Sequence, residues 1–349
     1  MTYVRRPKID LPGQRRNELG LTQRDYEGSV STLCAGCGHD SITAAVVQAL
    51  WEMSIVPEQL IKMSGIGCSS KTPAYFVHGA HGFNSVHGRM PSVATGAIAA
   101  NRDLICVGVS GDGDSLSIGV GQFGHVIRRN LNMLYLIENN GVYGLTKGQY
   151  SPTSAFGTRS VSSPDGSIEN PVNPVGVAIG NEAAFIARTV DVFQKHMSEV
   201  LKRAAQHHGA TMVEIAQNCI IFNDGAWAHM TDPENRKQNV LYLEHGQPMR
   251  FGKQGEKGIR LNGLHPEVVD VDAVGEENLL VHDEQAAEPT LAYLLSRMGP
   301  PDFPIPVGVF RAIDKPVYSA RLMDQVRAAQ DKSKPDLDAL FRQGECWEV

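Results

Sequence analysis

The chain has 349 residues, six cysteines and a formal net charge of −6 at pH 7, and this length is enough to bury a large core. Its acidic balance and the lack of a basic stripe argue against nucleic acid as a partner. The polar start lacks the apolar core of a signal peptide and no apolar run is long enough to span a bilayer, so we expect a cytoplasmic protein with no membrane partner.

The N-terminal part of the chain contains a closely spaced cysteine pair. Residues 1–30 mix basic and acidic residues and predict an extended arm that wraps a surface or contacts a partner. Cys34 and Cys37 follow in the segment CAGCGH, and the apolar spacing of residues 41–53 predicts a helix directly after them. In a reducing compartment this CxxC segment is compatible with zinc, with a redox dithiol or with an iron–sulfur cluster.

Two further cysteines follow predicted strands. Residues 61–64 predict a short strand that ends in a glycine-rich turn with Cys68, and residues 212–215 predict a strand that leads to Cys219. Four thiolates on loops suit a [4Fe–4S] cluster, although their spacing alone leaves zinc equally open.

The stretch between these two cysteines predicts a βαβ unit. An apolar run at 104–109 leads into the turn GDGD, a segment with helical spacing follows, and a second apolar run at 133–137 leads into the turn NNG. Cys106 lies in the first run and is expected to pack in the core. The carboxyl ends of neighbouring parallel strands meet at one edge of a sheet, where ligands of open α/β folds bind. This edge is therefore the predicted ligand site.

Oxygen ligands and glycines occur together in those two turns. Asp112 offers a carboxylate oxygen and Asn140 a neutral one, and both are ligands that Mg²⁺ prefers. Gly111 and Gly113 let backbone N–H groups approach a diphosphate, and the N-terminus of the following helix adds positive potential. Two turns that bind nothing are the alternative, but their joint occurrence at this spacing favours a ligand site.

The remaining segments predict a loop, helices and an appended tail. Residues 152–174 are rich in Ser, Pro, Gly and Asn and predict a long irregular loop. Residues 175–205 have helical patterns and predict helices. After about residue 240 the pattern weakens, so residues 241–349 predict an extension that packs on a partner subunit. Cys346 in this extension has no context that assigns it a role.

The motifs and their order resemble the β subunit of 2-oxoacid:ferredoxin oxidoreductases. GDG followed by 25 residues and NN is similar to the thiamine-diphosphate motif, and CxGCGH, GIGCSSK, HGR, ATG, NNxVYGLTKGQ and QNC occur in the order of that family over residues 30–228. The 2-oxoglutarate (Kor) type is the most similar. The resemblance implies an α/β fold with a thiamine-diphosphate-binding, doubly wound and mostly parallel sheet of the diphosphate type. It implies an N-terminal arm at 1–30, a cofactor domain at 31–240 and a C-terminal extension at 241–349.

The same resemblance implies roles for individual residues. It places the cluster ligands at Cys34, Cys37, Cys68 and Cys219. It places the Mg²⁺ ligands at Asp112, Asn140 and the backbone carbonyl of Val142. Contacts with the bound cofactor are implied for Gly111, Gly113, Asp114, His39, Gly144 and Thr146.

Three side chains are expected to act near the substrate. Lys71 matches a lysine that faces the 2-oxoacid carboxylate, which suits a cation, and a solvated loop lysine is the alternative. Leu145 matches a position that lines the pocket. His39 is expected to reach the cofactor region, with a structural histidine as the alternative. His87 and Arg89 are compatible with contacts to phosphate or to a partner.

The implied activity is the CoA-dependent oxidative decarboxylation of a 2-oxoacid, with 2-oxoglutarate as the first choice. Thiamine diphosphate supplies the carbanion, the [4Fe–4S] cluster takes electrons singly, coenzyme A takes the acyl group and ferredoxin takes the electrons. An α subunit in an α₂β₂ assembly is expected to supply the glutamate that activates the cofactor, because this chain has only one domain of the cofactor type. The alternatives are a non-redox thiamine-diphosphate decarboxylase or carboligase subunit with a structural zinc site, and a structural subunit that binds neither cofactor.

Overall fold

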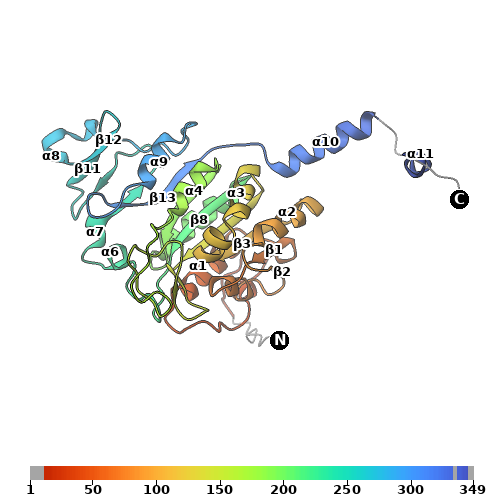
Figure 1. Cartoon of the computed structure of the whole chain (residues 1–349), viewed down its shortest axis with the longest axis horizontal. Helices are drawn as coiled ribbons and strands as arrows, with labels where there is room; N and C mark the ends of the chain where they lie inside the picture. Colours follow the sequence, from red (N-terminus) through yellow and green to blue (C-terminus); the bar gives the residue numbers. More distant parts are fainter. Residues whose placement is uncertain (1–11, 333–335, 345–349) are drawn as a thin grey trace.

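An eight-stranded sheet forms the centre of the computed structural model, which describes residues 12–332 and 336–344 (Figure 1). In spatial order its strands are β2 (His81–Asn84), β1 (Leu60–Ser64), β3 (Ile105–Gly111), β4 (Met133–Asn139), β8 (Ala210–Ala216), β7 (Phe185–Val190), β13 (Ile305–Ala312) and β9 (Val240–Leu243). Every neighbouring pair from β2 to β7 is parallel, whereas β13 is antiparallel to β7. The predicted mostly parallel α/β sheet is confirmed.

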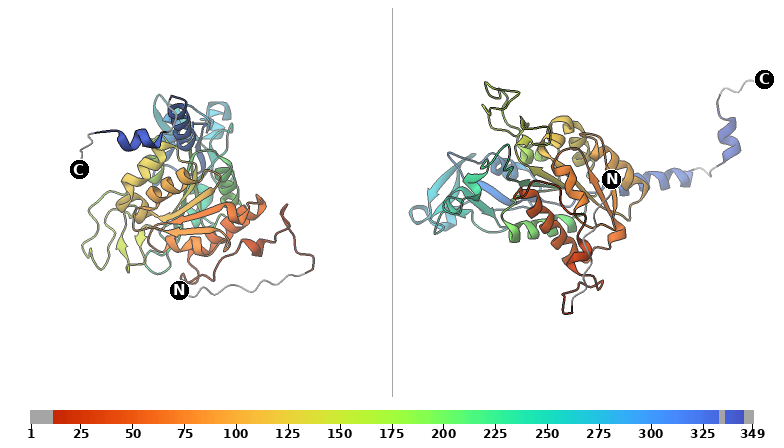
Figure 2. Two further views of the ribbon diagram at one scale, coloured as in Figure 1. Left: turned by 90° about the vertical axis from the view of Figure 1, so that its right-hand side faces the viewer. Right: turned by 90° about the horizontal axis from the view of Figure 1, so that it is seen from below.

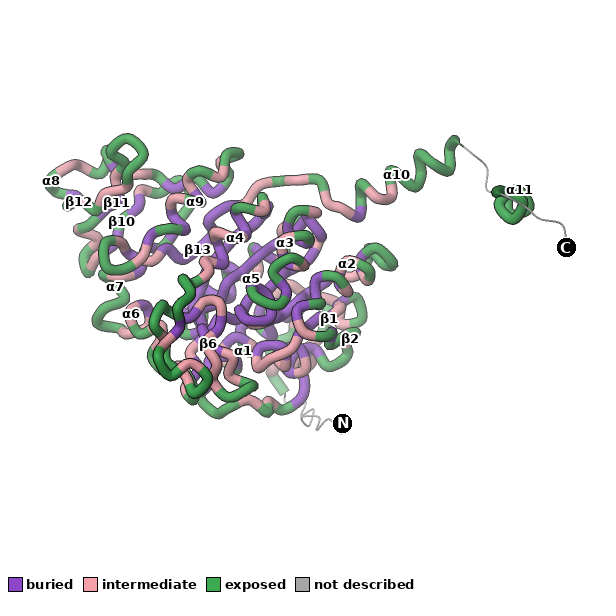
Figure 3. Tube along the Cα trace, in the orientation of Figure 1, coloured by how far each residue is buried: buried purple, intermediate pink, exposed green. Residues whose placement is uncertain are grey.

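Helices cover both faces of the sheet. One face carries α2 (Met90–Ala100), α3 (Val120–Arg129), α4 (Pro174–Gly180) and α9 (Thr290–Ser296), and the other carries α1 (Gly38–Glu52) and α5 (Gln194–Gln206). Because both faces are covered, β4 and β8 are buried along their whole length, as is usual for central parallel strands. Figure 3 shows this buried layer at the centre of the molecule.

The helices form because their apolar residues recur on one side. In α1 the buried residues Ile42, Val46 and Leu50 recur every four residues and pack against the sheet. In α3 the last turn carries two arginines, and Asn130 ends the helix in the left-handed conformation at φ 52°.

One predicted helical segment contains a strand. The sequence favours helices throughout 175–205, but α4 ends at Gly180 and residues 185–190 form β7, so the prediction is wrong there. All six residues of β7 are buried, and a strand buried on both faces lacks the alternation of apolar and polar residues that identifies a strand. The predicted helix before Gly209 is confirmed as α5.

The sheet does not end at the predicted boundary near residue 240. Strands β9 and β13 both belong to it, so the prediction of an appended tail from residue 241 onwards is wrong for residues 241–312. The sequence did not predict β13, because prolines lie before and within it and proline argues against a strand interior. Between β9 and β13 lies a small antiparallel sheet of β10 (Arg250–Phe251), β11 (Lys257–Asn262) and β12 (His265–Asp270).

The extension proper begins after β13. Helix α10 (Tyr318–Lys332) leads away from the body, and α11 (Leu337–Arg342) follows it (Figure 2). The apolar side chains of Leu337, Leu340 and Phe341 are exposed. None of the helices in the described ranges combines the length and the apolar character that crossing a bilayer requires.

Part of the predicted N-terminal arm packs on the body. A 3₁₀ helix, η1 (Gln23–Tyr26), ends at Tyr26, whose buried side chain donates a hydrogen bond to the Ile55 carbonyl at 2.6 Å. Asn17 also donates to the carbonyl of Trp51, at 3.1 Å. The first eleven residues of the arm and Cys346 lie outside the described residues.

Candidate functional site

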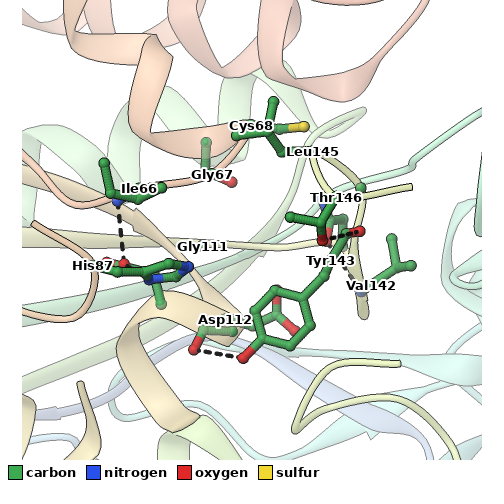
Figure 4. Close-up of a pocket in the computed structure, with 15 residues that line it drawn as sticks. Ile66, Gly67, Cys68, His87, Gly111, Asp112, Val142, Tyr143, Leu145 and Thr146 are labelled. Atoms are coloured by element: carbon green, nitrogen blue, oxygen red, sulfur yellow. Dashed lines mark hydrogen bonds and ion pairs between the residues drawn. The ribbon is translucent and has the colours of Figure 1, made fainter. Parts of the chain in front are cut away.

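The carboxyl ends of four neighbouring strands form the candidate site. Strands β1, β3, β4 and β8 are adjacent and parallel, and the loops that follow them carry Cys68, Asp112, Asn140 and Cys219. A pocket opens at this edge, and the first three of these residues line it (Figure 4). The sheet topology therefore brings together Cys68 and Asn140, which are 72 positions apart, as the sequence predicts for a switch point of an open α/β sheet.

Asp112 is the buried acid of the site. Its Oδ2 atom accepts hydrogen bonds from the hydroxyls of Ser151 and Thr153, each at 2.5 Å. Burial raises the pKa of the Asp112 carboxyl, and the two hydroxyls oppose that rise. Among the described residues, no lysine or arginine forms an ion pair with this carboxylate. A buried acid with hydrogen bonds on one oxygen and no cationic partner fits the role of a metal ligand.

The other two predicted Mg²⁺ ligands lie on the turn after β4. Asn140 Oδ1 accepts from the Val142 backbone N–H at 3.2 Å, which holds the turn closed. Gly141 has a φ of 63°, in the left-handed region that favours glycine. Asn140 and Val142 line the same pocket as Asp112, so the structure brings the three predicted ligands together.

Gly113 permits a close approach in the GDGD turn. The Tyr143 hydroxyl donates to the Gly113 carbonyl at 3.1 Å, and a Cβ atom at position 113 would lie 2.2 Å from the Tyr143 ring. A larger residue at 113 would therefore displace Tyr143, which comes from the short strand β5 (Val142–Tyr143). Gly111 also lines the pocket.

Asp114 holds three loops together. Its Oδ1 atom accepts from the backbone N–H groups of Ile66 at 3.1 Å and Gly88 at 2.8 Å, and it contacts His87 Nδ1. Its Oδ2 atom accepts from the Ser110 hydroxyl. The residue lines the pocket, but its carboxylate is engaged by protein donors. Its hydrogen bonds fix the loops after β1 and β2 against the GDGD turn.

The four predicted cluster cysteines form the opposite side of the site. Cys37 precedes α1 and Cys68 precedes the 3₁₀ helix η3 (Ser69–Ala74), while Cys34 and Cys219 lie on loops. Burial raises the pKa of the Cys37 thiol to about 11, and the charges of Cys219, Cys34 and Cys68 add to the rise. All four thiols are thus close enough to interact electrostatically.

Gly144 leaves room beside two of these thiols. A Cβ atom at position 144 would lie 3.5 Å from Cys68 Sγ and 3.7 Å from Cys219 Sγ. Within the described ranges, no three His, Cys, Asp or Glu side chains converge closely enough to bind a single metal ion. Cys68 and Cys219 approach the same glycine from different loops, and thiols on separate loops fit a Cys₄ cluster, in which each thiolate binds a different iron.

The remaining predicted residues divide into two groups. Leu145 and Thr146 line the pocket, and Leu145 is 43% exposed there. Lys71 and His39 do not belong to the described lining. Lys71 is half-buried on η3, where its charge opposes the rise in the Cys68 pKa that is caused chiefly by burial.

The His39 side chain is fully buried and lies next to Cys37. Its Nδ1 atom lies 3.0 Å from Cys37 Sγ, and its Nε2 atom lies 2.9 Å from the Ser69 hydroxyl and 3.4 Å from Glu138 Oε2. Burial lowers the pKa of His39 to about 4 and raises that of Glu138 well above its ordinary value. In both cases burial disfavours the charged form of the side chain.

Several residues of the site were not predicted from the sequence. Ser151 and Thr153 bind Asp112, Glu138 contacts His39, and the Gln217 amide lies 3.2 Å from Cys37 Sγ. The motif QNC contains Gln217, and this is the one sequence signal for it. His87 lines the pocket and pairs with Asp114, while Arg89 does not belong to the described lining.

Comparisons with known proteins agree with this site. A family model described as the C-terminal TPP-binding domain of thiamine pyrophosphate enzymes matches residues 65–215. The 2-oxoglutarate oxidoreductase subunit KorB of Mycobacterium tuberculosis is 42% identical over 308 residues, which are 88% of this chain and 82% of that protein. The 2-oxoacid:ferredoxin oxidoreductase subunit beta of Saccharolobus solfataricus is 41% identical over 191 residues, which are 55% of this chain and 63% of that protein.

A solved structure is similar over almost the whole chain. It is the 2-oxoglutarate:ferredoxin oxidoreductase from Magnetococcus marinus with 2-oxoglutarate, coenzyme A and succinyl-CoA bound. The match has a TM-score of 0.75 and 28% sequence identity, and covers 97% of this chain and 100% of that chain. Because it is 42% identical to the mycobacterial protein over most of both sequences, this chain belongs to the KorB family of 2-oxoacid:ferredoxin oxidoreductase β subunits.

Proposed function

We propose that this chain is the thiamine-diphosphate-binding β subunit of an enzyme that oxidises 2-oxoglutarate to an acyl-CoA and CO₂. Its relatives are named for 2-oxoglutarate and 2-oxoacid oxidation, and the similar solved structure holds 2-oxoglutarate and coenzyme A. We further propose that Cys34, Cys37, Cys68 and Cys219 hold a [4Fe–4S] cluster that passes electrons to ferredoxin.

One observation carries this proposal. Cys68 lines the same pocket as Asp112, Asn140 and Val142, so a proposed cluster ligand and the proposed Mg²⁺ ligands share one cavity. Figure 4 shows Cys68 and Asp112 on opposite sides of that cavity. A non-redox thiamine enzyme would have no use for a thiol set placed against its cofactor pocket.

The cofactor side supports thiamine diphosphate held through Mg²⁺. Asp112, Asn140 and the Val142 carbonyl supply oxygen ligands, and Mg²⁺ of this kind fills its other positions with phosphate oxygens. Gly111 and Gly113 line the pocket and would let backbone N–H groups approach the diphosphate. When bound, thiamine diphosphate supplies the carbanion chemistry that decarboxylation of a 2-oxoacid requires. The protein's residues hold the metal and position the diphosphate.

The substrate side rests on two residues. Lys71 is the cation nearest to Cys68 in sequence, and a cation beside the pocket would bind the carboxylate of a 2-oxoacid. Leu145 offers an exposed apolar side chain in the pocket wall. We assign His39 to the cluster side, since it is buried against Cys37 and not in the described pocket lining.

A partner subunit is required to complete the site. The acids in the described pocket lining are Asp112 and Asp114, so the glutamate that thiamine enzymes need is proposed to come from an α subunit in an α₂β₂ assembly. Exposed apolar side chains in or after β2 and the GDGD turn support the docking of a partner: Phe83, Val86, Ile118 and Val120. The N-terminal arm and helices α10 and α11 offer further surface for subunit contacts.

The described cysteines support a reducing compartment. All five of them are free, which suits the cytoplasmic location proposed from the sequence.

Reconstitution with and without the partner tests the proposal. We expect the anaerobically purified complex with its α subunit to reduce ferredoxin when supplied with 2-oxoglutarate and coenzyme A, and the isolated chain to show negligible turnover. Full activity of the isolated chain would contradict the shared active site, and a complex that decarboxylates 2-oxoglutarate without reducing ferredoxin would contradict the redox role.

A further inference from the structure

Cys37 differs from the other three proposed cluster ligands in its hydrogen bonds. Its Sγ atom lies 3.0 Å from His39 Nδ1 and 3.2 Å from Gln217 Nε2. Within the described part of the chain, the sulfur atoms of Cys34, Cys68 and Cys219 have no such nitrogen neighbour among the side-chain hydrogen bonds. One thiolate of the four is therefore placed to receive two N–H donors.

The Gln217 amide is held in place by the fold. The residue directly follows β8, is fully buried, and donates its backbone N–H to the Asn139 carbonyl at 2.8 Å. Gly38 allows the approach of its side chain, because a Cβ atom at position 38 would lie 2.9 Å from Gln217 Cγ. This packing fixes the amide next to the sulfur.

The neighbours of the amide fix which end faces Cys37. The Nε2 atom contacts Cys37 Sγ and the Asn218 carbonyl, and both of these accept hydrogen bonds when the thiol is ionised. Among the described residues Oε1 is buried without a hydrogen-bond partner. The contacts of Nε2 therefore direct the N–H end of the amide towards the sulfur.

His39 provides the second donor. An iron-bound thiolate can only accept hydrogen bonds, so the imidazole next to it carries a proton on Nδ1. Its Nε2 atom lies 2.9 Å from the Ser69 hydroxyl. Ser69 lines the pocket, so the ring is braced from the cofactor side.

We propose that Gln217 and His39 are positioning residues that raise the reduction potential of the proposed [4Fe–4S] cluster by donating two N–H···S hydrogen bonds to Cys37. This inference rests on the proposed function. Reduction adds negative charge to the cluster, and hydrogen bonds to its sulfurs stabilise that charge. Loss of either donor therefore shifts the reduction equilibrium towards the oxidised cluster.

Replacing the amide tests the inference in the purified complex. Gln217→Met keeps the length of the buried side chain and removes its N–H groups. We expect the equilibrium constant for reduction to fall about tenfold, which is about 59 mV towards lower potential for a one-electron couple. An anaerobic redox titration followed by EPR measures this shift. Gln48→Met makes the same replacement on the exposed side of α1 and should leave the potential unchanged.

Iron and acid-labile sulfide analysis separates the possible failures. A wild-type complex without iron and sulfide bound to this chain would overturn the proposed function and the inference with it. A Gln217→Met complex with wild-type iron content and an unchanged potential would overturn the inference alone.

A measurement on the wild-type protein decides the case in which the variant assembles no cluster. Pulsed EPR of the reduced cluster should show weak couplings to two nitrogen nuclei, and labelling with ¹⁵N-histidine should change one of them. A spectrum without a histidine coupling would contradict the role of His39, and the absence of both couplings would contradict the proposal.

Discussion

The two sides of the pocket are built in different ways. The side with Asp112 and Asn140 comes from one continuous βαβ unit, β3 to β4, and its turns are braced by nearby hydroxyls and backbone N–H groups. The thiol side takes Cys37, Cys68 and Cys219 from three distant segments. The first is therefore a local structure, while the second exists only when the whole sheet is folded.

This difference indicates which substitutions should impair cofactor binding and which should impair cluster binding. A local unit tolerates changes elsewhere and depends on its own ligands. A set of thiols gathered from distant loops depends on every member, because a cluster with one open site is poorly held. The following predictions separate the two sides.

The largest effect is expected for Cys219→Ala. Removing one proposed ligand should reduce the iron bound by this chain to less than about a tenth of the wild-type amount and abolish ferredoxin reduction, while thiamine-diphosphate binding persists. Iron analysis and calorimetric titration measure the two properties. Cys106→Ala is the matched control, since Cys106 is buried in β3 and should keep the wild-type iron content. Normal iron content in Cys219→Ala would remove this residue from the ligand set.

The opposite pattern is expected for Asp112→Ala. Loss of the buried carboxylate should weaken Mg²⁺-dependent thiamine-diphosphate binding by about 100-fold or more and leave the iron content unchanged. Calorimetric titration of the cofactor at saturating Mg²⁺ tests this. A simultaneous loss of iron would show that the two sides are not independent.

A smaller effect is expected for Asp114→Ala. The change leaves the backbone N–H groups of Ile66 and Gly88 without their acceptor, so the complex should lose about 3 kcal/mol of stability and bind the cofactor about tenfold more weakly. Thermal unfolding and cofactor titration measure both effects. The same change at exposed Asp103 is the control, and equal behaviour of the two variants would contradict the proposed bracing.

The smallest effect is expected for Ser151→Ala and Thr153→Val. Each removes one hydroxyl from Asp112 Oδ2 and should raise the Mg²⁺ concentration needed for half-maximal cofactor binding by about tenfold. A Mg²⁺ titration at fixed thiamine diphosphate gives this value. An unchanged Mg²⁺ requirement in both variants would show that the hydroxyls do not orient the carboxylate.

The local side of the pocket was also the more predictable one. The strands and turns around Asp112 and Asn140 follow from apolar runs and turn residues that are contiguous in the sequence. Strand β7 was not predicted, because a strand buried on both faces has no alternating pattern, and β13 was hidden by its prolines.

The bracing residues could not be predicted from patterns. Asp114 was expected near the cofactor, but its bonds to Ile66 and Gly88 depend on three loops that meet only in the folded sheet. The same holds for Gln217, whose amide reaches a sulfur 180 residues away in the sequence. The sequence thus indicates the ligands, and the structure shows what holds them.

The metal content of the anaerobically purified chain tests the central claim most directly. The account predicts about four iron and four acid-labile sulfide per chain, with an EPR signal of a reduced cluster after addition of dithionite. Zinc without sulfide would contradict the redox mechanism and would favour a non-oxidative thiamine enzyme with a structural zinc site.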